Sequence, residues 1–182
     1  MKLPIALLLG AVSLGSTAAE PADSTTTDST KTFIFTDVIS LPTTSVKDQN
    51  KSGTCWCFAG TSFYENEIRK NGGDSLDLSE MFTVRQCYRD KAERYVRMYG
   101  QTNFGAGGSI MDLPYVWKRY GAVPQEVYTG LQYGEDKHVH GEFDGALAGL
   151  VKTVVAKPNR KVSSAWKKAL NGILDAYLGE VP

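Results

Sequence analysis

The sequence of 182 residues has few cysteines, few histidines and no excess of charge of either sign. Three cysteines are too few for a small fold held together by disulfides, and an odd number leaves at least one thiol free. Lys and Arg together number 20, as do Asp and Glu, so neither a nucleic-acid binder nor a charged interaction tail is expected. Hydrophobic residues make up 42% and charged residues 22%, as in ordinary globular proteins, and the length fits one domain with a tail.

A long apolar stretch occurs at the N-terminus. Residues 3–14 are almost wholly apolar, follow Lys2 and precede the small residues Thr17, Ala18 and Ala19. This order is typical of a secretory signal peptide, which we predict over residues 1–19, and the run is too short to span a bilayer in the mature protein. We therefore expect a secreted or periplasmic protein with no stable membrane span once the signal is removed.

After the signal peptide, the composition predicts a linker and then one folded domain. Residues 20–31 are rich in Ser, Thr and Asp, which predicts a flexible linker, and the domain is expected over residues 32–182. Apolar spacing indicates that the domain is mostly helical, with an extended arm or strand over 33–41. Helices are predicted over 55–70, 80–99, 109–120 and 143–155, and a last helix carries Trp166, Leu170 and Leu174 on one face.

Two local signals refine these predicted helices. Ser79 is a favourable N-cap for the helix over 80–99, because Ser side chains accept hydrogen bonds from first-turn N–H groups. On the first helix, Trp56, Ala59 and Phe63 recur at spacings of three and four residues, which predicts that they share the buried face.

The segment from Gln49 to Ala59 combines the residue types that acyl transfer needs. Cys55 stands at the start of a predicted helix, after a turn at Gly53, and the unsatisfied N–H groups of a helix N-terminus favour a thiolate. Its own N–H and the side-chain amide of Gln49 can both donate to the oxyanion of a tetrahedral intermediate. We predict that Cys55 is a nucleophile and Gln49 an oxyanion donor; the alternative is that Cys55 is a small buried hydrophobic residue.

This segment resembles the active-site segment of papain-like cysteine peptidases, most of all that of the bleomycin hydrolase and aminopeptidase C branch. The branch pattern Gln-x-x-Ser-Gly-x-Cys-Trp is present over Gln49 to Trp56, with Ser52 where papain itself has a disulfide cysteine. Further similar blocks, which extend the resemblance over about residues 42–182, are Leu78-Ser79-Glu80, Asp90 to Arg94, Gly107-Gly108, Tyr120 to Pro124 and Ile173 to Pro182.

The resemblance implies an α+β papain-like fold, of which this chain would be the N-terminal, mainly helical (left) subdomain. It implies that Trp56 packs beside the nucleophile and that Gly107 and Gly108 form a shelf for the substrate backbone, because glycine permits close approach. Substrates would be peptides, with no cofactor and no metal. Asp90 and Arg94 lie four residues apart in one of the similar blocks and are expected to form an ion pair on one helix face.

The family's site also needs a His and an Asn, and this sequence offers only two histidines. His138 and His140 lie in a polar segment that we predict to be a solvated loop, with a metal site as the less favoured alternative. We therefore expect the catalytic His and Asn beyond Pro182, in a missing C-terminal half, so that this chain alone would be inactive and could associate into oligomers.

Two functional alternatives and one question about the cysteines stay open at this point. The chain could be a catalytically inactive binding module of the same fold, or it could carry out a different acyl transfer on the same cysteine. Cys57 and Cys87 are expected to be two buried thiols, although a disulfide between them is possible in a secreted protein.

Overall fold

The computed structural model describes residues 34–156 and 161–182, so the predicted signal peptide (1–19) and linker (20–31) lie outside the described residues. The chain divides into two units, Met1–Val38 and Ile39–Pro182. The backbone of residues 34–41 is irregular and forms no strand, which is consistent with an extended arm. No helix in the described ranges is long and apolar enough to cross a membrane.

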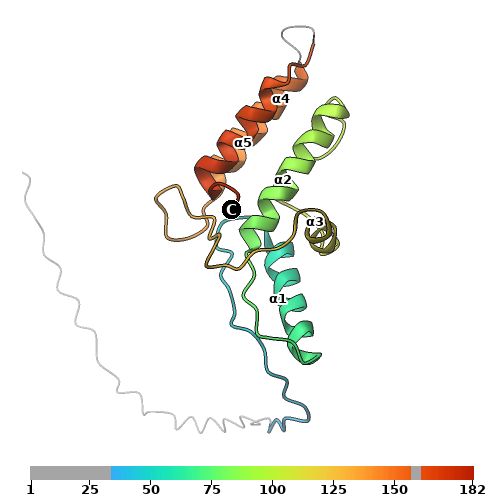
Figure 1. Ribbon diagram of the computed structural model, residues 1–182, viewed down its shortest axis with the longest axis vertical. Helices are drawn as coiled ribbons and strands as arrows, with labels where there is room; N and C mark the ends of the chain where they lie inside the picture. Colours follow the sequence, from blue (N-terminus) through green and yellow to red (C-terminus); the bar gives the residue numbers. More distant parts are fainter. Residues whose placement is uncertain (1–33, 157–160) are drawn as a thin grey trace, which may run out of the picture. The chain divides into compact units, whose positions relative to one another are not determined.

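Five α-helices build the described part of the second unit: α1 Cys55–Lys70, α2 Glu80–Arg97, α3 Asp112–Tyr120, α4 Gly141–Ala156 and α5 Ala165–Leu178. Helix α2 is central and contacts each of the other four, while α4 and α5 pack against each other (Figure 1). Isolated β-bridges join Lys51 to Val139 and Leu78 to Pro124. The predicted helix-dominated region is therefore confirmed for the residues that the structure describes.

Local signals placed most helix ends correctly. Helix α1 has the predicted bounds, and the Ser79 side chain caps α2 by accepting a hydrogen bond from the Phe82 N–H at 3.0 Å. Helix α2 ends at Arg97, before the predicted residue 99, because the backbone turns left-handed at Tyr99, where φ is 53°. Helix α3 begins at Asp112, whose carboxylate accepts a hydrogen bond from the Ser109 N–H at 2.8 Å.

The core lies between α2 and its neighbours. The last helix buries the predicted residues Trp166, Leu170 and Leu174. The buried core residues that α2, α3 and α4 contribute are Met81, Phe82, Val84, Cys87, Tyr88, Ala92, Val96, Leu113, Val116, Phe143, Leu147 and Val151.

The predicted buried face of α1 is wrong in part. Ala59 is exposed and Phe63 is 50% exposed, whereas α1 buries Gly60 and Glu65 together with Trp56, Cys57 and Thr61. The reason is that α3 packs closely on Gly60: a Cβ atom there would lie 2.9 Å from Cδ1 of Leu113. Apolar spacing did not reveal this face because three of its five residues, Gly60, Thr61 and Glu65, are small or polar.

Buried charges join α1, α2 and the segment that precedes α1. The Nζ atom of Lys47 lies 3.2 Å from Glu65, 2.9 Å from Glu80 and 2.7 Å from Asp77. The side chain of Glu65 is fully buried and that of Glu80 is 3% exposed. Burial alone would lower the pKa of Lys47, but hydrogen bonds and attraction to the three carboxylates outweigh it and raise that pKa. The ammonium group therefore stays charged and fixes this junction.

We predict that Lys47→Met lowers the free energy of unfolding by about 3–5 kcal/mol, because it leaves two carboxylates buried without their counter-charge. Urea denaturation measures the change. Lys70→Met is the matched control, since Lys70 pairs with Glu67 at 3.6 Å on the surface and should contribute less than about 1 kcal/mol. Equal effects of the two substitutions would contradict the structural importance of this junction.

Candidate active site

Cys55 is the first residue of α1, and its thiol is free and exposed to solvent. The chain enters the helix through a turn at Gly53, where φ is +64° and a Cβ atom would lie 3.0 Å from the Cβ atom of Ala106. The buried side chains of Ser52 and Thr54 hydrogen-bond to each other at 2.5 Å. The side chain of Thr54, the N-cap residue, does not cap α1, and its carbonyl oxygen accepts a hydrogen bond from the Cys57 N–H at 2.8 Å. The N–H groups of Cys55 and Trp56 have no backbone partner among the described residues.

Gln49 lies on the same loop and is half-buried. Its side-chain amide forms no hydrogen bond within the described part of the chain, so it is available to donate to a ligand. A left-handed turn at Asn50 follows, with φ of 46° and a hydrogen bond of 2.8 Å from its N–H to the Asp48 carboxylate. The predicted roles of Cys55 and Gln49 stay predictions.

The predicted glycine shelf packs directly against Trp56, the residue that follows the predicted nucleophile. Trp56 is 9% exposed, and its indole N–H donates to the carbonyl oxygen of Ala106 at 2.9 Å. A Cβ atom on Gly108 would lie 2.5 Å from Cε2 of Trp56, so glycine is required there, whereas Gly107 has open space around it. The structure thus brings together the Cys55 loop and the Gly107–Gly108 segment. Trp56 lies buried beneath the shelf, in a supporting position.

Lys91, on α2, belongs to the block from Asp90 to Arg94, for which the sequence predicted a structural role but no contact with the shelf. Its Nζ atom donates hydrogen bonds to the carbonyl oxygens of Gly107 and, at 3.3 Å, Gly105. The same atom lies 5.6 Å from the ring centroid of Trp56, in a cation–π contact. No local sequence signal predicts these contacts, because the end of α2 and the following loop separate Lys91 from Gly105 and Gly107.

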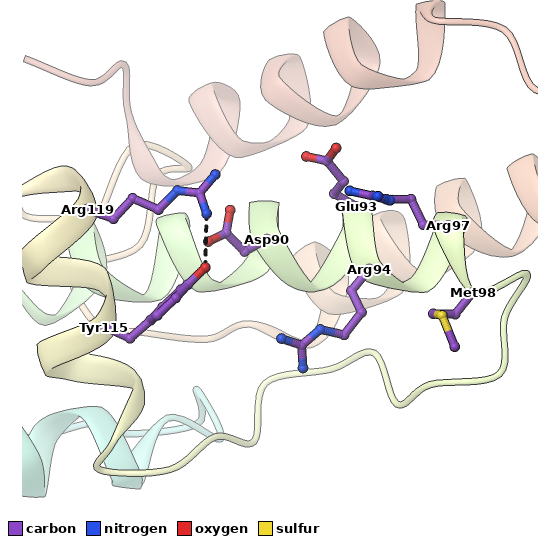
Figure 2. A pocket seen from close by; sticks show the side chains of 7 residues that line it. All are labelled: Asp90, Glu93, Arg94, Arg97, Met98, Tyr115 and Arg119. Atoms are coloured by element: carbon purple, nitrogen blue, oxygen red, sulfur yellow. Dashed lines mark hydrogen bonds between the residues drawn. The ribbon is translucent and has the colours of Figure 1, made fainter.

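The predicted ion pair between Asp90 and Arg94 does not form. Asp90 instead accepts a hydrogen bond from the Tyr120 hydroxyl at 2.6 Å, and Figure 2 shows the Arg94 side chain directed away from it. Both residues line a cleft of about 360 Å³ between α2 and α3, where Arg119 donates to the Tyr115 hydroxyl at 3.0 Å (Figure 2). Neither Cys55 nor a glycine of the shelf lines this cleft, so it is distinct from the candidate active site.

The two histidines are buried, so the prediction of a solvated loop is wrong. His140 is fully buried and His138 is 8% exposed, with their ring centroids 5.7 Å apart. Backbone hydrogen bonds fix the segment to the active-site loop: the Lys51 N–H donates to the His138 carbonyl at 2.9 Å, and the His140 N–H donates to the Lys51 carbonyl at 3.2 Å. Both rings then pack on aromatic side chains, His138 on Phe58 and His140 on Phe143.

Burial also decides the protonation of these rings. Burial lowers the pKa of His138, and burial together with the neighbouring His138 lowers the pKa of His140 to about 4. Both rings are therefore neutral at neutral pH, and neither hydrogen-bonds to Cys55 in the described ranges. Over the same residues no group of three side chains is placed to ligate a metal ion, which leaves the metal alternative without support.

Comparison with known proteins agrees with this geometry. Residues 36–171, more than half of the chain, match the family described as papain family cysteine protease. The chain belongs to this papain family. Cysteine proteinase 1, mitochondrial, from Saccharomyces cerevisiae strains YJM789 and S288c, is 30% identical over 122 residues. The match covers 55% of this chain and 24% of each relative, so the chain spans about a quarter of the length of these curated relatives.

A solved structure confirms the fold. PepW from Lactobacillus rhamnosis HN001 superposes with a TM-score of 0.58 at 23% sequence identity, over 81% of this chain and 39% of that chain. The predicted α+β papain-like fold is therefore confirmed, and the described helices correspond to its helical subdomain. The predicted resemblance to the papain family is confirmed as well.

We predict that the buried histidines make the fold sensitive to acid. The folded pKa of His140 is about 4, below the ordinary value near 6.5, so the unfolded chain binds more protons between these pH values and stability falls as pH falls. His140→Phe should remove about 3 kcal/mol of this pH dependence, at 1.36 kcal/mol per pKa unit.

Urea unfolding at pH 7.5 and pH 4.5 tests this. Carboxylates titrate equally in both proteins. The difference between wild type and His140→Phe in the free energy of unfolding lost between the two pH values therefore gives the contribution of the His140 imidazole. The same loss of stability in both proteins would contradict the assignment.

Proposed function

We propose that this chain carries the nucleophile of a cysteine-type peptidase, which cleaves peptide bonds through an acyl-enzyme on Cys55. The observation that carries the proposal is the exposed thiol of Cys55 at the N-terminus of α1, beside the glycine shelf on Trp56. The thiolate attacks the substrate carbonyl carbon, and the N–H of Cys55 and the amide of Gln49 stabilise the oxyanion. The C–N bond then breaks, the amine leaves with a proton, and water hydrolyses the thioester.

We propose that the catalytic base is neither His138 nor His140. A leaving amine needs a proton from a general acid, which helix N–H groups cannot deliver. His138 and His140 are buried against aromatic rings and make no hydrogen bond to Cys55 in the described residues. We therefore assign the imidazole to a further part of the full-length protein.

The proposed substrates are peptides, shortened from their N-terminus. This follows from the likeness of the Gln49–Trp56 segment to the bleomycin hydrolase and aminopeptidase C branch, and from family membership. Two peptides of the same sequence, one with a blocked N-terminus and one with a free N-terminus, distinguish aminopeptidase from endopeptidase action. An aminopeptidase cleaves only the peptide with the free N-terminus, whereas an endopeptidase cleaves both.

We predict that Cys55→Ala abolishes peptide turnover by the full-length protein and that Gln49→Ala lowers kcat by about 10²–10³, the usual range for the loss of one oxyanion donor. Cys87→Ala is the matched control, because Cys87 is buried on α2 and should leave turnover unchanged. Steady-state kinetics give both values. A wild-type protein without turnover would favour the inactive binding module, and turnover by Cys55→Ala would exclude the proposed nucleophile.

The proposed location is outside the cytoplasm, after removal of a signal peptide. Its support is the charge of Lys2, the apolar stretch over residues 3–14 and the small residues before Glu20. N-terminal sequencing of the protein from its natural source should begin near Glu20. A mature protein that still begins at Met1 would contradict this location.

A further inference from the structure

We propose that Lys91 is a positioning residue for substrate binding, which holds the glycine shelf so that the N–H of Gly108 faces the substrate backbone. This rests on the proposed peptidase function, because the shelf has a substrate only if Cys55 is the nucleophile. Lys91 lies on α2, and its ammonium group donates a hydrogen bond to the carbonyl oxygen of Gly107, the first residue of the shelf.

Three successive carbonyl groups, which lead into the shelf and end at its first residue, accept hydrogen bonds from side chains. Lys91 donates to the carbonyl oxygens of Gly105 and Gly107, and the indole of Trp56 donates to that of Ala106 between them, at 2.9 Å. Hydrogen bonds from an ammonium group to a carbonyl are stronger than those between neutral groups. The backbone of a segment rich in glycine, which would otherwise be highly flexible, is thereby fixed.

The direction of the next N–H group follows from the planarity of the peptide bond. In a trans peptide, the carbonyl of one residue and the N–H of the next point in opposite directions. The carbonyl of Gly107 points to Lys91, so the N–H of Gly108 points away from it. Gly108 is exposed and its N–H makes no backbone hydrogen bond within the described residues. It is therefore free to donate to an extended peptide, in the manner of β-strand addition.

The contact of Gly108 with Trp56 restricts the conformations that the backbone of the shelf can adopt. The tryptophan ring closes one side of Gly108, where a Cβ atom would lie 2.5 Å from Cε2, so the segment cannot turn into that space. The ammonium group of Lys91 also lies 5.6 Å from the centroid of this ring. Loss of the ammonium would release the Gly107 carbonyl towards water and leave the peptide plane free to rotate, while Cys55 on α1 would keep its surroundings.

Two alkylating probes of Cys55 in the full-length protein test the proposal. Iodoacetamide is small and makes no backbone contact with the shelf. A peptidyl epoxide lays an extended peptide along it; the thiolate sulfur attacks an epoxide carbon, the C–S bond forms, the C–O bond breaks, and the oxygen takes a proton from water. Lys91→Met should slow labelling by the epoxide about tenfold, in line with the loss of about one hydrogen bond, and should leave labelling by iodoacetamide within about twofold.

Two further variants complete the comparison. Lys91→Arg keeps the charge and the donors and should restore most of the epoxide rate, and Lys118→Met makes the same substitution at an exposed position on α3 and should change neither rate. Should Lys91→Met fail to fold, as judged by circular dichroism, Lys91→Gln replaces it.

The outcomes separate this inference from the proposed function. Epoxide labelling of Lys91→Met at the wild-type rate overturns the positioning role, and so does an equal slowing of both probes, which would indicate a structural role only. In either case Cys55 stays the proposed nucleophile. A wild-type protein in which Cys55 reacts with neither probe would overturn the proposed function itself.

Discussion

The ammonium group of Lys47 neutralises carboxylates that are buried where α1 and α2 meet, 3.2 Å from Glu65 and 2.9 Å from Glu80. Two carboxylates without this partner would carry a large desolvation cost in the core. Because Lys47 is held so firmly, the loop that begins at Gln49, two residues later, starts from a fixed point. The position of the predicted oxyanion donor therefore depends on an ion pair that has no part in the chemistry.

Helix α2 holds the chain on both sides of Cys55, the proposed nucleophile. Glu80, at its first turn, binds Lys47 and so anchors the loop before Cys55; Lys91, further along, binds the carbonyl groups of the glycine shelf. Trp56 joins the two sides, since it follows Cys55 and its indole N–H donates to the carbonyl oxygen of Ala106, next to the shelf. The proposed oxyanion donor and the proposed binding surface are thus held in place before substrate arrives. Groups held in this way need little reorganisation during reaction, which is how enzyme sites stabilise transition states.

Sequence reasoning predicted what is encoded locally and missed what tertiary contacts decide. The bounds of α1 and the Ser79 cap followed from turn residues and capping, and the association of the Cys55 loop with Gly107 and Gly108 followed from the resemblance to papain-like peptidases. The roles of Lys47 and Lys91 did not, because their partners lie on other elements and no periodicity links them. The polar composition around His138 and His140 was misleading, since a β-bridge to Lys51 turns both rings into the core.

The central claim, that Cys55 is the activated thiol of this papain-family chain, is tested most directly by mapping the site of a covalent adduct. The native protein is treated with a limiting amount of peptidyl epoxide and digested, and each cysteine peptide is examined by mass spectrometry. Burial raises the pKa of Cys57 and raises that of Cys87 to about 12, so neither thiol should react. The account predicts an adduct on Cys55 and none on the other two; an adduct on Cys57 or Cys87 with Cys55 unmodified would contradict it.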